Sequence, residues 1–319
     1  MTFRIGSRGS RLALWQAEHV KSKLEGVHPG LDVEIRILHT TGDRITDVPL
    51  AKIGDKGLFT KELDRAVLSG EVDSAVHSLK DVPTRLPEGL GLGAVLERED
   101  PRDVFLPGPD RPTTLADLPE GAIIGTSSLR RRAQLLHYRP DFRVRDLRGN
   151  LDTRFARLRE GGYDGVLLAR AGVLRLGMES AVGEVLDPPT WLPAVGQGAL
   201  GVAIREDDTR IRELLAPLNH APTAATTAAE RAFLRELEGG CQIPIGALAK
   251  IADGELRLEG LVAAIGGDPL LRGDASGPLA EAERIGRGLA HSLLEQGAGE
   301  ILAEIRGTDP RDLPNASAP

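Results

Sequence analysis

Apolar and polar residues follow two different periods along this chain. Residues 31–39 place an apolar side chain on every second position, which predicts a strand. From about Ser10 the apolar residues recur three or four positions apart, which predicts a helix. A strand at 2–6 precedes that helix, and a helix at 58–69 and a strand at 72–76 follow it. Strands that alternate with helices favour an α/β fold with mostly parallel strands.

The last third of the chain has a different order of elements. A helix is predicted from about residue 222, then strands at about 244–251 and 255–265, and helices between about 278 and 306. This order indicates a small α+β domain. The tail at 308–319 is rich in Pro, Asp and Ala, and we expect it to be disordered.

One arrangement of strand, polar turn and arginine-bearing helix occurs three times. Its copies are RIGSRGSRLALW at 4–15, AIIGTSSLRRRAQLL at 122–136, and the strand at 142–147 followed by LRGNLDTRFARL. A helix N-terminus offers unpaired N–H groups and partial positive charge, which arginines reinforce. Loops at the carboxyl ends of strands in an open α/β sheet line the ligand cleft, so all three copies are expected to face one anion site.

Composition and charge narrow the class of protein. At 319 residues the chain exceeds one ordinary core, so we expect two or three domains, and 41% apolar with 27% charged residues indicates a soluble globular protein. A net charge of -7 disfavours nucleic-acid and membrane partners. The N-terminal residues lack the apolar core of a signal peptide, and one cysteine cannot staple a fold, so we expect a cytoplasmic protein. No motif predicts a metal site.

Positive charge is concentrated in one segment. Residues 130–159 hold ten arginines against three aspartates. Arginine binds carboxylate or phosphate through a planar fork of donors, so this segment predicts a site for a polyanionic small molecule. A solvated helix face is the alternative that charge alone leaves open.

The only cysteine, Cys241, lies in the run EGGCQIPIGA. Gly239 and Gly240 leave room for a bulky covalent adduct on its sulfur. An ordinary buried thiol is the simplest alternative. A thiol hydrolase is another, but it requires a histidine base, and His220, the nearest in sequence, lies in no nucleophile motif.

Eight strings, in a fixed order along nearly the whole chain, resemble the porphobilinogen deaminase (hydroxymethylbilane synthase) family. The strings are TTGD (40–43), KGLFTKEL (56–63), VHSLKDVPT (76–84), EREDPRDVF (97–105), GTSSLRRRAQL (125–135), LRGNLDTR (147–154), LPAVGQGAL (192–200) and EGGCQIPIGA (238–247). The resemblance implies two α/β lobes like those of type II periplasmic binding proteins and a small α+β C-terminal domain. We expect domain 1 at 1–98 with 197–217, domain 2 at 99–196 and domain 3 at 218–307.

The resemblance also implies an activity. Four porphobilinogen molecules would be condensed head to tail into hydroxymethylbilane, with loss of ammonia, on a dipyrromethane cofactor held by a thioether to Cys241. Each substrate pyrrole carries an acetate and a propionate, so the growing chain is a polycarboxylate that an arginine-rich cleft suits. The protein would be a monomer whose partner is this small molecule. A solute-binding protein for a polycarboxylate is the alternative, although such receptors usually carry an export signal.

The family motifs assign roles to single residues. Asp81 would be the catalytic carboxylate, with an ordinary pair to Lys80 as its alternative. The residues implied to bind the cofactor are Cys241, Lys80, Ser78, Thr126, Ser128, Arg130, Arg131 and Arg148. Those implied to bind substrate are Arg8, Ser10, Arg154, Arg175, Lys52 and Lys56. The stretch 42–57 is expected to be a mobile lid, and His77 is interpreted as a packing residue rather than a base.

Overall fold

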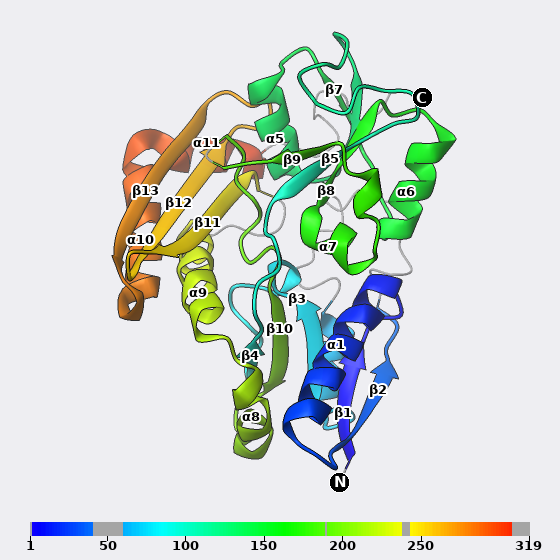
Figure 1. Ribbon diagram of the computed structural model, residues 1–319. Coiled ribbons are helices and arrows are strands. Elements are labelled where there is room, and N and C mark those ends of the chain that lie inside the picture. Colours follow the sequence, from blue (N-terminus) through cyan, green and yellow to red (C-terminus); the bar gives the residue numbers. More distant parts are fainter. Residues whose placement is uncertain (1, 41–59, 189, 238–242, 308–319) are drawn as a thin grey trace.

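The computed structural model describes residues 2–40, 60–188, 190–237 and 243–307 (Figure 1). These residues form two lobes, each built on a five-stranded sheet, and a C-terminal domain with a three-stranded sheet. Lys52, Lys56, Cys241, the predicted lid and the predicted tail lie outside the described residues.

The first lobe has the strand order β2-β1-β3-β10-β4. Its strands are β1 (Thr2–Ser7), β2 (Asp32–Ile37), β3 (Ser74–Ser78), β4 (Leu90–Val95) and β10 (Leu200–Arg205). β1 is parallel to β2 and β3, but β10 is antiparallel to both β3 and β4. The expectation of mostly parallel strands is therefore wrong for half of the strand pairings in this sheet. β10 follows all strands of the second lobe in sequence, so local pattern does not reveal its direction in the first sheet.

Helices cover both faces of the first sheet. They are α1 (Arg11–Val27), α4 (Lys61–Leu68) and α8 (Thr209–Leu215). α1 buries Val20 and Leu24 in one core with Val76, whereas α4 packs in a separate core with Ala75. Neighbouring residues of a strand point to opposite faces, so α1 and α4 lie on opposite sides of the sheet. Ser10 begins α1 by accepting a hydrogen bond from the Ala13 N–H, as the predicted helix start requires.

The second lobe repeats this plan with the strand order β7-β6-β8-β5-β9. Its strands are β5 (Asp103–Pro107), β6 (Ile123–Gly125), β7 (Arg143–Arg145), β8 (Gly165–Ala169) and β9 (Glu184–Leu186), and its helices are α5 (Leu129–Tyr138), α6 (Leu151–Glu160) and α7 (Arg170–Arg175). β6 is parallel to β7 and β8, and β5 is antiparallel to β8 and β9. Both lobes thus place their parallel strands on one side of a reversed strand.

The C-terminal domain is an antiparallel sheet covered by helices on one face. Its strands are β11 (Ile245–Ala252), β12 (Glu255–Ala263) and β13 (Leu270–Pro278), and its helices are α9 (Ala221–Glu236), α10 (Ala282–Leu293) and α11 (Gly299–Gly307). Phe233, Leu258 and Leu289 lie in its core. β13 was not predicted, because this edge strand has few apolar residues and its sequence LLRGDASGP shows no clear alternation.

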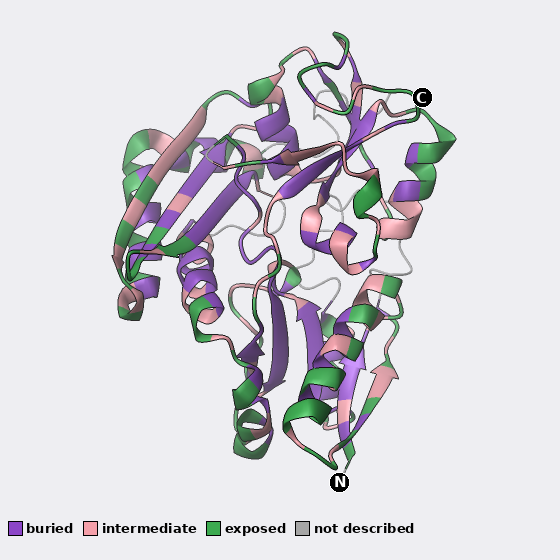
Figure 2. Cartoon of the chain, in the orientation of Figure 1, coloured by how far each residue is buried: buried purple, intermediate pink, exposed green. Residues whose placement is uncertain are grey.

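Short helical turns join these elements. They are η1 (Leu79–Asp81), η2 (Glu179–Ala181), η3 (Ala216–Leu218) and η4 (Leu279–Glu281), with a π-helical turn, η5 (Leu294–Ala298), between α10 and α11. Figure 2 shows buried residues mainly on the inner strands of the sheets, and intermediate and exposed residues along the edge strands β2 and β13 and on the outer turns of the helices. No described helix is long and apolar enough to cross a membrane.

Candidate active site

The turn at the end of β3 carries the predicted catalytic residue. β3 ends at Ser78, and η1 follows at once with Leu79 buried beneath it. The Leu79 N–H donates to the Ala199 carbonyl at 3.0 Å, which fixes the turn against the segment before β10. Gly196 has a φ of +71°, and a Cβ there would stand 3.2 Å from the Leu79 side chain. This support leaves the Asp81 side chain exposed.

A hollow lies at the carboxyl ends of β1 and β3. It encloses about 420 Å³ of empty space, open solvent at its mouth included. Four of the predicted site residues line it: Arg8, Ser10, Ser78 and Asp81. The structure therefore brings together side chains that are about 70 residues apart in sequence. The other two copies of the repeated turn contribute no residue to this hollow, so a single anion site shared by all three copies stays a prediction.

Two further residues of this hollow were not assigned to the site from sequence. Gln16 is buried on α1 and donates from Nε2 to the Ser78 hydroxyl at 2.8 Å, so it orients Ser78. His77 is buried in the wall, where burial and the nearby Arg8 charge lower its pKa to about 4. His77 is therefore neutral at neutral pH. Helical spacing from Ser10 was the only sequence signal for Gln16.

Thr126 and Ser128 shape the turn between β6 and α5. The Ser128 hydroxyl accepts from the Arg131 N–H as the helix cap, and the Thr126 hydroxyl accepts from the Ser128 N–H at 3.2 Å. These bonds hold the start of α5, as predicted for this repeat of the pattern. Their role toward a ligand stays a prediction.

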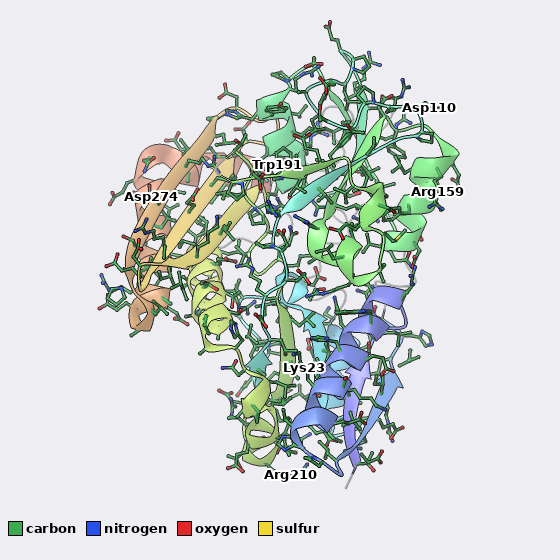
Figure 3. The ribbon with its side chains drawn as sticks, viewed as in Figure 1. Lys23, Asp110, Arg159, Trp191, Arg210 and Asp274 are labelled. Carbon is green, nitrogen blue, oxygen red and sulfur yellow. The ribbon has the colours of Figure 1, made fainter. Side chains whose placement is uncertain are left out.

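Arg130 and Arg131 lie in a buried network that we call the Asp103 cluster, made of Asp103, Arg130, Arg131, Trp191 and Gln197. Asp103 is 0% exposed. Arg130 Nη1 donates to one oxygen of Asp103 at 2.6 Å, and Arg131 Nη2 donates to the other at 2.7 Å. Trp191 Nε1 and Gln197 Nε2 each add a bond of 2.9 Å. Trp191 lies where the second lobe meets the C-terminal domain (Figure 3).

Asp103 neutralises its two arginines only in part, because one carboxylate faces two guanidinium groups. Burial opposes ionisation of Asp103, but the charges and hydrogen bonds of Arg130 and Arg131 hold its pKa far below the usual range. Sequence reasoning missed Asp103 and Gln197, although both lie in quoted motifs. Neither motif shows that two arginines assigned to ligand binding share a carboxylate inside the protein.

The family motifs assign ligand binding to four other cations, which we call the cleft cations: Lys80, Arg148, Arg154 and Arg175. None of the four is among the residues that line the hollow. Burial lowers the pKa of Lys80 to about 8, with Asp81 opposing and Arg131 adding to the shift. Burial lowers the pKa of Arg154 to about 10, with the charge of Arg131 as the next cause. Burial also lowers the pKa of Arg175 to about 10 against the attraction of Glu99. Arg148 is shifted in the same direction by burial.

Several donors of the cleft cations have no acceptor. Lys80 Nζ donates to Gln197 Oε1 at 3.3 Å, Arg154 Nε to the Gly149 carbonyl at 3.0 Å, and Arg175 Nη2 to the Gly198 carbonyl at 2.6 Å. Among the described residues, Arg148 Nε and Nη2 and Arg175 Nε are buried without a hydrogen-bond partner. Buried polar atoms nearly always have partners, so these N–H groups are available to donate to a ligand.

Arg132 and His220 are two further residues whose surroundings the structure describes. Arg132 is buried, and Asp146 is the charge that opposes the burial-driven lowering of its pKa. His220 caps α9, with its Nδ1 2.8 Å from the Thr223 hydroxyl. This contact, together with the Thr223 N–H that donates to Nδ1 at 3.4 Å, accounts for His220 as a helix cap.

Sequence comparisons place the chain among known proteins. The profile of the porphobilinogen deaminase dipyromethane cofactor binding domain matches residues 3–213, and that of the C-terminal domain matches residues 224–295. Porphobilinogen deaminase of Nitratidesulfovibrio vulgaris is 54% identical over 95% of this chain and 97% of its own length. Its counterpart in Syntrophobacter fumaroxidans is 52% identical over 95% of this chain and 97% of its own length.

Solved structures give a weaker likeness. A periplasmic binding protein of Salmonella typhimurium with high arginine specificity matches with a TM-score of 0.39 and 14% identity over 70% of this chain and 93% of its own. That similarity is too low to carry an argument. The two domain profiles and the nearly full-length relatives favour the enzyme over the solute-binding alternative, and the chain belongs to the porphobilinogen deaminase family.

Proposed function

We propose that the hollow and the cleft cations together form the active site in which this protein performs its family's reaction. The enzyme is a hydroxymethylbilane synthase: it joins four porphobilinogen molecules head to tail with release of ammonia. Its cofactor is dipyrromethane, which supplies the pyrrole carbon to which the first substrate is added. The observation that carries our residue assignments is the set of desolvated cations beside the exposed Asp81.

The residues present fit a polycarboxylate cofactor. A pyrrole with acetate and propionate groups offers carboxylates that match the unpartnered donors of Arg148 and Arg175. Lys80 and Ser78 would hold the cofactor with Arg148, while Arg8, Ser10, Arg154 and Arg175 would bind substrate. Two more proposed cofactor ligands, Arg130 and Arg131, lie behind this set. We propose that their bonds to Asp103 fix the orientation of Arg130 and Arg131. The positive charge that Asp103 does not neutralise would then attract the ligand.

Asp81 is the proposed catalytic carboxylate. Loss of ammonia from porphobilinogen leaves positive charge spread over the pyrrole ring and its nitrogen. A carboxylate beside the ring nitrogen stabilises that charge more in the transition state than in the ground state, which is the condition for faster reaction. Asp81 lines the hollow and is exposed, so it can accept the pyrrole N–H hydrogen bond.

Two of the cleft cations, Lys80 and Arg154, are influenced by the charge of Asp81. Lys80 adjoins Asp81, whose negative charge partly offsets the lowering of the Lys80 pKa by burial. Arg154 is also attracted by Asp81 and repelled by Arg148. A bound carboxylate relieves this repulsion, so substrate binding and cation placement stabilise each other.

Cellular location and oligomeric state are proposed from the charge, the composition and the family resemblance. We propose a monomer in the cytoplasm that binds no nucleic acid, because the net charge is -7 and the sequence has a single cysteine. The three sheets support the proposed domains 1–98 with 197–217, 99–196 and 218–307. Lys52, Lys56, Thr126 and Ser128 are proposed as further ligand contacts from their family motifs.

Intact-protein mass spectrometry tests the assigned anchor. The purified active enzyme is expected to exceed its sequence mass by one dipyrromethane, and Cys241→Ala is expected to lose both the added mass and all activity. The absorbance of a pyrrole with acidic aldehyde reagent provides a second readout on the same samples. Active wild-type protein with an unmodified mass would contradict the covalent attachment to Cys241.

A further inference from the structure

An aromatic residue of the first lobe lies against a cleft cation of the second. The Arg175 guanidinium carbon is 5.5 Å from the ring centroid of Trp15. Trp15 in turn stacks on His19, with ring centroids 5.1 Å apart and planes inclined by 9°. Trp15 and His19 are four residues apart on α1, so they share one face of the helix.

That face of α1 reaches the second lobe. Arg11 Nη2 donates to the Leu176 carbonyl at 3.1 Å, directly after Arg175. A Cβ on Gly172 of α7 would stand 3.7 Å from Leu12. Figure 1 shows the start of α1 beneath α7. The contact between Trp15 and Arg175 therefore belongs to a junction between the two lobes.

Trp15 does little for the core of its own lobe. Its side chain is 36% exposed, and it belongs to none of the buried clusters of the described residues. Arg175, by contrast, has one bond to the Gly198 carbonyl and a buried Nε without a partner among the described residues. A guanidinium held by one carbonyl has freedom to rotate, and an aromatic face restricts that freedom by stacking and by attraction to the cation.

We propose that Trp15 is a positioning residue that holds Arg175 in the orientation needed to bind a substrate carboxylate. The proposal rests on the proposed function, in which Arg175 contacts substrate. His19 supports the indole by stacking on it. Burial and the charges of Lys23 and Arg175 lower the pKa of His19, so the stack presents a neutral ring rather than a second cation.

The test is a double-mutant cycle on the cofactor-loaded enzyme. Trp15→Leu is expected to lower kcat/KM for porphobilinogen by about threefold to tenfold, mostly through KM, because it loosens a binding group and leaves the reacting centre intact. Trp15→Phe retains an aromatic face and is expected to recover most of the loss. Tyr138→Leu removes another exposed aromatic side chain and serves as the matched control, with kinetics unchanged.

Arg175→Gln makes the cycle decisive. In that background Trp15→Leu is expected to have no further effect, since the cation that it positions is gone. Additive losses would overturn the positioning role. If Arg175→Gln impairs binding and Trp15→Leu does not, the positioning role alone is wrong. Wild-type kinetics in Arg175→Gln would instead refute the assignment of Arg175 to substrate, and the role of Trp15 with it.

Discussion

Asp103 and Asp81 are two aspartates whose charges both act on Lys80, and their surroundings differ in almost every respect. Asp103 is fully buried and accepts hydrogen bonds from two arginines, a tryptophan and a glutamine. Asp81 is exposed, and no side chain within the described ranges donates to its carboxylate. One aspartate has its donors supplied by the protein, and the other has acceptor capacity that the described residues leave unused.

The difference suits one aspartate to stabilise the fold and the other to take part in the reaction. A carboxylate that already binds several donors fixes the cations around it and has little left for a ligand. A carboxylate with free lone pairs can accept a pyrrole N–H and respond to charge that develops on substrate. We infer that Asp103 is needed for the fold of the second lobe and Asp81 for turnover.

Replacement of Asp103 is expected to have the largest effect. Asp103→Asn removes the charge that two buried arginines share, and such a loss in a buried ion network costs about 3–5 kcal/mol of unfolding free energy. Urea unfolding followed by circular dichroism measures it. Asp152→Asn, which breaks the exposed pair with Arg11, is the control and is expected to cost at most about 1 kcal/mol. Equal unfolding midpoints for the two variants would remove the structural half of the comparison.

Replacement of Asp81 is expected to leave stability nearly unchanged and to reduce turnover. Asp81→Asn keeps the shape and deletes the charge, so kcat should fall by about a hundredfold or more, as for the loss of one preorganised electrostatic group. Asp81→Glu should retain a measurable fraction, because its charge survives at a displaced position. Steady-state assays with porphobilinogen measure both. Near wild-type kcat in Asp81→Asn would make this carboxylate only a partner of Lys80.

The smallest expected effect is a pH dependence of stability from Lys80. Burial lowers the pKa of Lys80 from 10.5 to about 8, so above about pH 8 the folded protein releases a proton that the unfolded chain keeps. Below about pH 8 the buried ammonium of Lys80 is charged, and this charge destabilises the folded protein. As the pH increases from about 8 toward the unfolded pKa the folded protein loses that charge, so the free energy of unfolding rises. Denaturant midpoints of Cys241→Ala protein between about pH 7 and pH 9.5 should show the rise.

The cofactor should weaken that pH dependence. Bound carboxylates favour the ammonium form of Lys80, so the loaded wild-type enzyme should show a smaller rise than Cys241→Ala. Lys80→Met in the Cys241→Ala background should flatten the curve. A rise of equal size with and without Lys80 would assign it to other groups.

Local pattern predicted much of this fold. Helix α1 begins after Ser10 and α9 begins at Ala221, both close to expectation. The strand-end pattern indicated the turn of Arg8 and Ser10, whereas Ser78 and Asp81 were assigned only from their family motif; all four line one hollow. The start of a helix is determined by residues that are close in sequence, and a local pattern contains that information.

What sequence missed depends on distant partners. Asp103 meets Arg130 and Arg131 only because β5 lies beside β8 and near the start of α5, a pairing that crosses 27 residues or more. An arginine-rich segment looks the same whether its charges face ligand or a buried aspartate. Gln16 likewise gains its importance from Ser78, 62 residues away.

The place of β10 has a consequence for how the protein is made. β10 lies between β3 and β4, and β4 has no other partner in its sheet, so the first lobe is incomplete until residue 205 has left the ribosome. All strands of the second lobe lie between residues 103 and 186 and emerge earlier. The second lobe is therefore expected to fold before the first during synthesis, while β3 and β4 wait with open edges that invite aggregation. Nascent chains stalled just before and just after β10 should differ sharply in their need for a chaperone.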